Sequence, residues 1–234
     1  MKNSNIDILE KLSNNENNNV RIAIAKNLHT PVNILIKLSD DENSDVRYYI
    51  ANNPNTPVDV LVKLSTDEDS FIRRAIVNNP HTPANILIKL SEDEEYYVRR
   101  AIAENIHTPL DILIKLSDED YDIMIAIANN PHTPSDILIY FSDNEDDDVR
   151  RYIAKNINTP VDVLIKLSTD KDSYVRRAVA KNQSTPIDVL INLLADKEYI
   201  VRHAVSKNID IPEDILIKIL TEYEVKNDFT NICH

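Results

Sequence analysis

Short apolar runs alternate along the chain with acidic polar stretches, and the pattern recurs many times. One copy has an apolar run over 60–64, an acidic stretch over 65–69 and a second apolar segment over 71–78. At about 100° per residue, the apolar positions of that second segment fall on one helix face, and they are Ile72, Ala75 and Ile76. Each copy therefore predicts two helices of no more than about ten residues, which must stack on their neighbours to be stable.

Proline marks the start of each copy after the first. The prolines that begin successive copies are 26 residues apart, except for a step of 25 from Pro109 to Pro134. The first copy begins near Asn5, and the last has a single helix that starts at Pro212 and stops near Leu220. The intervening copies start at Pro31, Pro57, Pro83, Pro109, Pro134, Pro160 and Pro186. The sequence predicts an all-α solenoid of eight two-helix repeats and a terminal half-repeat, as one domain over 1–234.

Residue types at the expected helix ends indicate how each helix begins. Thr precedes the repeat proline in seven copies and is expected to N-cap the first helix, with Pro at the first helical position. The last copy has Ile211 instead. The last residue of each acidic turn is placed to cap the second helix, and these residues are Asn17, Asn43, Asp69, Glu95, Asp120, Asp146, Asp172 and Glu198.

An asparagine recurs where each second helix should end, for example at Asn53 and Asn156. Asparagine tolerates left-handed backbone geometry, which suits a helix end in a chain without glycine. Where proline follows, as at Pro54, an extended backbone is favoured. We expect these asparagines to be partly buried, with amides that bond the turn backbone.

One row of arginines lies on the flank of the second helices, where the next repeat should meet it. The row is Arg21, Arg47, Arg73, Arg99, Arg150, Arg176 and Arg202, and Met124 takes the remaining position. We expect these arginines to pair with turn acids such as Asp41 and Asp67. At Met124 the acidic turn, 118–122, is also one residue shorter. The coincidence predicts a break in the Asp–Arg ladder and a small change in curvature there.

The segment Asn-Pro-His-Thr-Pro-Ala-Asn-Ile-Leu-Ile-Lys-Leu-Ser at 79–91, continued by Val-Arg-Arg-Ala-Ile-Ala at 98–103, resembles the leucine-rich repeat variant family. Asp-Ser-Tyr-Val-Arg at 172–176 is similar to the signature of HEAT repeats. The resemblance covers roughly residues 5–220 and implies a right-handed superhelix without strands, in which one helix of each pair is either α or 3₁₀. Asn17 and Asn43 stand where the HEAT signature has an acid, so the resemblance leaves the first two acid–Arg rungs open.

Composition excludes several function classes. The chain has no glycine and no tryptophan, which excludes glycine-rich phosphate loops, dinucleotide fingerprints and nucleophile elbows. Its net charge of −13 argues against general nucleic-acid binding. Cys233 is the only cysteine, so the iron–sulfur cluster that some relatives carry on N-terminal cysteines is not expected.

We expect neither a metal, a cofactor nor catalytic residues. The acidic turns lack the spacing and the glycine of a calcium loop. Four histidines recur in turns and are interpreted as turn residues, because stacked helices lie too far apart for shared ligation. These are His29, His81, His107 and His132. The N-terminal segment has no apolar signal core and no later segment offers about 18 apolar residues, so a cytoplasmic protein without a membrane span is expected.

A second row on the outer face of the second helices carries the candidate binding residues. In the C-terminal half this row and the residues one turn later form a basic stripe, consisting of Arg151, Lys155, Arg177, Lys181, His203 and Lys207. Earlier repeats add Arg74, Arg100 and Ile125. A merely solvated helix face is the alternative for the whole set.

These observations favour a non-enzymatic scaffold that binds a protein or an acidic peptide through successive second helices. The alternative is nucleic-acid or phosphate-ligand binding through the basic stripe, and a third interpretation is a structural spacer. The sequence leaves the oligomeric state open.

Overall fold

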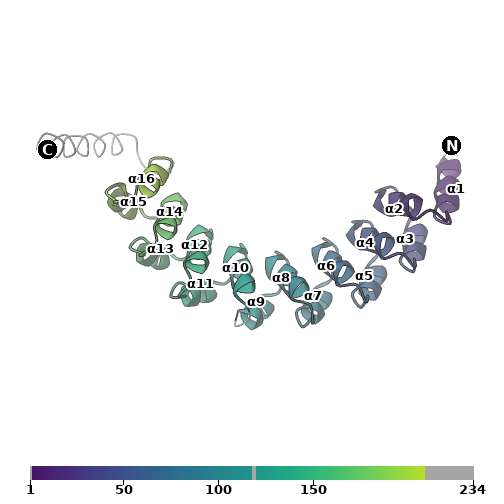
Figure 1. Cartoon of the computed structure of the whole chain (residues 1–234), viewed down its shortest axis with the longest axis horizontal. Helices are drawn as coiled ribbons and strands as arrows, with labels where there is room; N and C mark the ends of the chain where they lie inside the picture. Colours follow the sequence, from purple (N-terminus) through teal and green to yellow (C-terminus); the bar gives the residue numbers. More distant parts are fainter. Residues whose placement is uncertain (1, 118–119, 209–234) are drawn as a thin grey trace, which may run out of the picture. The chain divides into compact units, whose positions relative to one another are not determined.

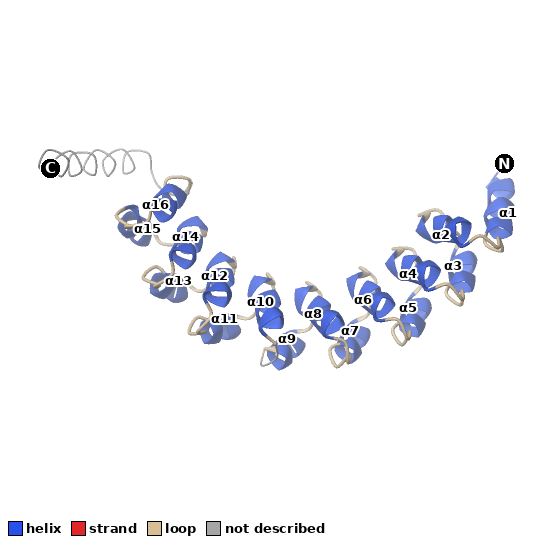
Figure 2. Ribbon diagram, viewed as in Figure 1, coloured by secondary structure: helices blue, strands red, loops and turns tan. Residues whose placement is uncertain are grey.

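A computed structural model describes residues 2–117 and 120–208, and this part of the chain contains sixteen α-helices and no strand (Figures 1 and 2). The helices are α1 (Lys2–Leu12), α2 (Asn18–Lys26), α3 (Val32–Leu38), α4 (Ser44–Asn52), α5 (Val58–Leu64), α6 (Ser70–Asn78), α7 (Ala84–Leu90), α8 (Tyr96–Glu104), α9 (Leu110–Leu116), α10 (Tyr121–Asn129), α11 (Ser135–Phe141), α12 (Asp147–Lys155), α13 (Val161–Leu167), α14 (Ser173–Lys181), α15 (Ile187–Leu194) and α16 (Tyr199–Val205). The all-α solenoid is confirmed. Both helices of each pair are α rather than 3₁₀.

The helices form two compact units, over Met1–Leu116 and Ser117–His234. Within each unit every second helix packs on the second helix of the next repeat, as α2, α4, α6 and α8 do in one and α10, α12, α14 and α16 in the other. The first helices contact the second helices beside them. A single domain over 1–234 stays a prediction.

Each helix buries one apolar face, as the period of the sequence predicts. In α6 the expected residues Ile72, Ala75 and Ile76 are all buried. In α13 the buried positions are Val163, Leu164 and Leu167. Since the helices are seven to eleven residues long, their stability comes from this inter-repeat burial rather than from helix propensity.

The threonine before each repeat proline does not cap the following helix, so that prediction is wrong. Proline itself is the N-cap, and its carbonyl accepts the first helical bond, as from Val163 N–H to Pro160 O at 3.0 Å. The threonine hydroxyl instead donates to a carbonyl at the end of the preceding second helix, as from Thr56 to Ile50 O at 2.6 Å. Proline can take the cap position because a helix leaves its first N–H groups unpaired in any case.

Acidic-turn residues cap five of the second helices as expected. Asp172, for example, accepts from the N–H groups of Tyr174 and Val175 at 2.7 and 3.0 Å. The others are Asn17, Asn43, Asp69 and Asp146. Glu95, Asp120 and Glu198 occupy the cap position without a side-chain bond to the helix. At Glu95 and Glu198 the extra methylene of glutamate carries the carboxylate past the N–H groups that aspartate reaches, and this reason does not apply to Asp120.

The asparagines at the repeat ends connect successive repeats. The Asn156 amide donates to Ala128 O and to Asn130 O, both at 2.8 Å, and its oxygen accepts from Asn158 N–H at 2.9 Å. The expected buried amides are therefore confirmed, and their donors reach the preceding repeat. The same inter-repeat bond is made by Asn53, Asn79, Asn105, Asn182 and Asn208.

The asparagines do not use the left-handed geometry that they tolerate, and the extended backbone expected where proline follows is confirmed at Asn53, Asn79 and Asn130. The asparagines that end α2 to α14 are extended, with φ between −74° and −65°. No residue in the described ranges has a positive φ. An extended backbone directs the amide back onto the preceding repeat. The helix α16 ends at Ser206 instead of at Asn208.

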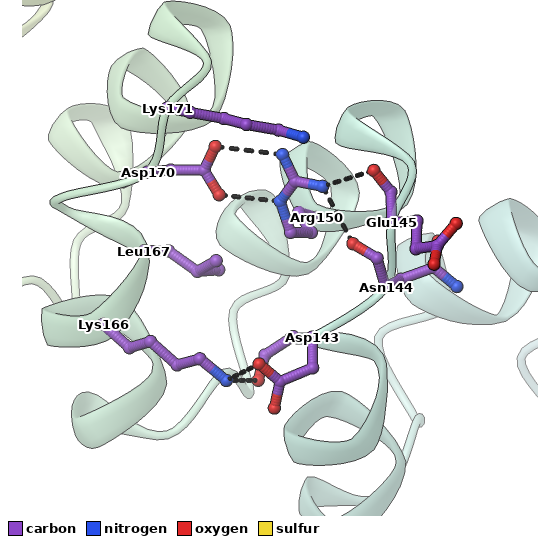
Figure 3. Close-up of a pocket in the computed structure, with 9 residues that line it drawn as sticks. Asp143, Asn144, Glu145, Arg150, Lys166, Leu167, Asp170 and Lys171 are labelled. Carbon is purple, nitrogen blue, oxygen red and sulfur yellow. Dashed lines mark hydrogen bonds and ion pairs between the residues drawn. The ribbon is translucent and has the colours of Figure 1, made fainter.

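The flank arginines form the expected ladder. Arg150 donates from Nε and Nη2 to the carboxylate of Asp170 in the next repeat, at 2.7 and 3.0 Å (Figure 3). Its Nη1 donates to the backbone oxygens of Asn144 and Glu145 in its own turn. The same bidentate rung joins Arg21 to Asp41, Arg47 to Asp67, Arg73 to Asp93 and Arg176 to Asp196.

The first two rungs are present although Asn17 and Asn43 lack an acid. Their acids are Asp41 and Asp67, each two residues before the cap of the following repeat. The cap residue therefore does not decide whether a rung forms.

The predicted break in the ladder occurs at Met124. Its thioether faces Asn144, which holds the position that Asp170 holds one repeat later. The accompanying change in curvature stays a prediction. The shortened turn at 118–119, the half-repeat from Pro212, Ile211 and Cys233 lie outside the described residues.

Candidate functional site

The basic stripe lies on three second helices that pack side by side. Within one unit α12 packs on α14 and α14 packs on α16. On α12 and on α14 the paired residues are four positions apart within the helix, so both point from the same face. They are Arg151 and Lys155 on α12 and Arg177 and Lys181 on α14. His203 lies on α16, whereas Lys207 lies in the turn after that helix has ended at Val205.

Four of these cations line one depression of about 240 Å³ between α12 and α14. We call it the basic depression, and its lining residues are Arg151, Lys155, Tyr174, Arg177, Ala178 and Lys181. Among them, Ala178 is buried. The structure thus brings together four of the nine candidate residues.

Only one carboxylate neutralises this group of cations within residues 120–208. Asp148 lies 2.6 Å from Nη2 of Arg151, one turn earlier on the same helix. Neither Arg177 nor Lys181 has a carboxylate within 4.0 Å in that part of the chain. The depression is therefore positively charged on a chain whose net charge is −13.

The cations of the depression repel one another. Burial lowers the pKa of the Lys155 ammonium group, and the charges of Arg151 and Lys181 lower it further. The ammonium lies 4.5 Å from the ring centroid of Tyr152, which partly compensates for the lost hydration. A bound anion would remove the repulsion.

Aromatic side chains on the same face were missed by the sequence reasoning. Tyr174 in the depression is 51% exposed. On α16 the Tyr199 ring stacks on His203 with centroids 5.6 Å apart. The signal was available, because eight of the ten tyrosines lie in second helices: Tyr48, Tyr49, Tyr96, Tyr97, Tyr121, Tyr152, Tyr174 and Tyr199.

The remaining candidates do not line the depression. Arg74 and Arg100 belong to the other unit, on α6 and α8. The Arg100 guanidinium pairs with Glu104 of its own helix at 3.0 Å, which reduces its value as an anion site. Ile125 is half-buried on α10.

A larger hollow of about 740 Å³ lies beside the Arg150–Asp170 rung (Figure 3). Besides the rung, a second ion pair lines the hollow, in which Lys166 contacts Asp143 at 2.6 Å. An equivalent hollow of about 520 Å³ lies beside the Arg47–Asp67 rung in the other unit. Because the hollow recurs with the repeat and the same two kinds of ion pair line both copies, we assign it to the architecture.

The four turn histidines are exposed. Within 2–117 and 120–208, no three His, Cys, Asp or Glu side chains gather in a way that could hold a metal ion. Nor does that part of the chain contain a helix with the length and apolar character needed to cross a bilayer.

Comparison with solved structures identifies the fold. A leucine-rich repeat variant, described as having a novel repetitive structural motif, matches with a TM-score of 0.61 at 26% identity over 84% of each chain. The resemblance predicted from the sequence is confirmed by this structure.

Two engineered proteins, each 19% identical, also match. One has a TM-score of 0.46 over 92% of this chain and 81% of that chain, and the other 0.32 over 86% and 94%. No protein-family model and no curated protein sequence matches the chain.

Proposed function

We propose that the chain is a non-enzymatic scaffold that binds a partner protein through the outer face of its second helices. The main support for this proposal is the basic depression, where four cations face a single carboxylate on an acidic chain. A charged group that serves only for solubility gains nothing from such crowding, whereas an anionic partner segment would relieve it.

The aromatic residues support a protein partner. Tyrosine and arginine supply much of the binding energy at protein interfaces, because they bury large surfaces while keeping a polar end. Tyr174 and Tyr199 are exposed next to cations on adjacent helices. Charge would steer the encounter, and burial of the rings would hold the complex together.

The test replaces two arginines of the depression, in Arg151→Glu with Arg177→Glu. The immobilised variant should capture at least about tenfold less partner protein from native-cell lysate than the wild-type chain. Its helical circular dichroism and melting temperature should stay close to wild type, because neither arginine belongs to the ladder.

The matched control is Lys171→Glu with Lys197→Glu. It makes the same change in net charge on exposed turn residues of the same unit, and it should keep the partner. Equal capture by the arginine variant and the control would overturn the proposed surface. If the wild-type chain captures no protein, the structural spacer is the better account.

Nucleic acid is the second candidate for the same stripe. A salt-titrated DNA-binding measurement separates the two, since binding through phosphates weakens steeply with salt. We expect no DNA binding near physiological ionic strength, because the negative charge of the rest of the chain opposes a polyanion.

A further inference from the structure

A small residue, Ala178, lines the basic depression. It occupies the helical position that Tyr49 holds in α4 and Tyr152 holds in α12, and the other second helices also carry alanine there. A tyrosine on α14 at this point would fill the space between the two helices. The resulting volume of about 240 Å³ suits one compact group rather than a whole ligand chain.

The charge of the depression exceeds what one carboxylate group can neutralise. Four cations and the one carboxylate of Asp148 leave a local charge of about +3. A carboxylate ligand brings one negative charge and two oxygens. A phosphate monoester brings about −1.5 to −2 at neutral pH and three acceptor oxygens.

The hydrogen-bond donors of the depression can bind several oxygen atoms of one ligand group. The Nε atom of Arg151 is buried and has no hydrogen-bond partner among the residues that the structure describes, although Nη2 of the same side chain contacts Asp148. Arg177 presents a guanidinium fork that no carboxylate occupies among residues 120–208. Arginine forks match phosphate oxygens in bidentate geometry, and lysines such as Lys155 and Lys181 add charge.

A ligand whose negative charge is confined to one group fits this chain better than a segment with many negative charges. The acidic turns carry most of the net charge of −13 and would repel a long run of carboxylates or a nucleic-acid strand. Screening limits this repulsion to about 8 Å at physiological ionic strength. A single phosphate in the depression, on an otherwise neutral or basic segment, avoids it.

We infer that the basic depression is a phosphate-monoester site that recognises a phosphorylated side chain on the partner protein. This inference rests on the proposed function. Neighbouring residues of the partner segment would pass over Tyr174 and towards the Tyr199–His203 stack on α16.

The test uses the full chain and peptide libraries of random flanking sequence with a fixed central residue. The central residue is phosphoserine, phosphothreonine, phosphotyrosine, their unmodified forms or glutamate, and binding is followed by fluorescence anisotropy. At least one phosphorylated library should bind about tenfold or more tightly than its unmodified and glutamate counterparts. In Arg151→Gln with Arg177→Gln this preference should disappear, whereas Lys171→Gln with Lys197→Gln should retain it.

Equal binding of phosphorylated and unmodified libraries, or a preference that survives in the arginine variant, would overturn the phosphate site. If the chain bound single-stranded DNA or phosphoinositide vesicles more tightly than any phosphopeptide, the inference that the phosphate group belongs to a partner protein would be overturned. Phosphatase treatment of the lysate separates the two proposals. If it leaves capture intact while Arg151→Glu with Arg177→Glu abolishes it, the scaffold stands and the phosphate site falls.

Discussion

The Sδ atom of Met124 lies 3.8 Å from Nδ2 of Asn144, in the rung position where Arg150 and Asp170 form a bidentate ion pair one repeat later. Both partners of the ordinary rung are replaced together, so neither repeat keeps an unpaired buried charge. The carboxylate oxygen that would cap the turn is replaced by the Asn144 amide oxygen, which accepts from Asp146 N–H at 3.0 Å.

This neutral rung predicts strong coupling between its two positions. Asn144→Asp alone should lower the free energy of unfolding by about 1–3 kcal/mol, because the partly buried carboxylate gains no guanidinium. Adding Met124→Arg should recover most of the loss. A double-mutant cycle of urea unfolding curves measures the coupling, expected at roughly 1–3 kcal/mol. Additive single effects would show that the two positions are independent.

The matched control transplants the neutral pair to an ordinary rung. Asp170→Asn alone leaves the Arg150 guanidinium buried without its acid, and its side chain is only 7% exposed. That variant should lose about 3–5 kcal/mol, as expected for breaking a buried pair. The double variant Asp170→Asn with Arg150→Met should lose clearly less free energy of unfolding than Asp170→Asn alone.

The ladder also predicts loss of stability in acid. Burial raises the pKa of Asp170, but the Arg150 hydrogen bonds and the Asp172 N–H lower it more, so the folded-state pKa lies below its ordinary value. The same direction holds for Asp41, Asp67, Asp93 and Asp196. A carboxyl group whose pKa is lower in the folded state than in the unfolded state stabilises the folded protein at pH values above the unfolded pKa of about 3.9. This contribution to stability is lost as the pH falls through the folded-state pKa.

We therefore expect the melting temperature to fall steeply below about pH 4. Thermal unfolding over a pH series measures it. The variant Arg150→Met with Asp170→Asn has one fewer ion pair with a titratable carboxylate, so its melting temperature should fall less steeply in acid. An equally steep fall in the variant and in the wild-type chain would mean that other carboxylates dominate acid unfolding.

The asparagine contacts predict a large effect of a small truncation. Asn156→Ala removes the donors to Ala128 O and Asn130 O in the preceding repeat, and only Asn130 O keeps another donor, the Thr133 N–H at 3.1 Å. The cost should be about 1–3 kcal/mol, measured by urea unfolding. Hydrogen exchange should show faster opening between α10 and α12.

Asn156→Asp is the informative comparison, because it keeps the shape. An ionised aspartate cannot donate, and its buried charge would face two carbonyls, which raises its folded pKa. The variant should be less stable than Asn156→Ala at neutral pH and should recover as pH falls and the carboxyl becomes a donor. A pH-independent difference between the two variants would contradict this account.

The sequence alone determined the repeat, the helix pairs and the buried faces, because these depend on local periodicity. The proline and asparagine spacing defines each repeat, and Ile72, Ala75 and Ile76 had to share a face of any helix over 70–78. The arginine row and its break at Met124 could also be predicted from the sequence, because each depends on one position per repeat.

Tertiary structure decided which partners the polar residues take. Thr56 has a proline after it and a helix end before it, and only the turn geometry directs its hydroxyl to Ile50 O. Asp41 and Asn43 are both turn residues, but the stacking distance places only Asp41 against Arg21. The basic depression likewise depends on Ala178 lying opposite Arg151 and Lys155. Contacts between repeats are set by how helices stack, and no local period of the sequence encodes that.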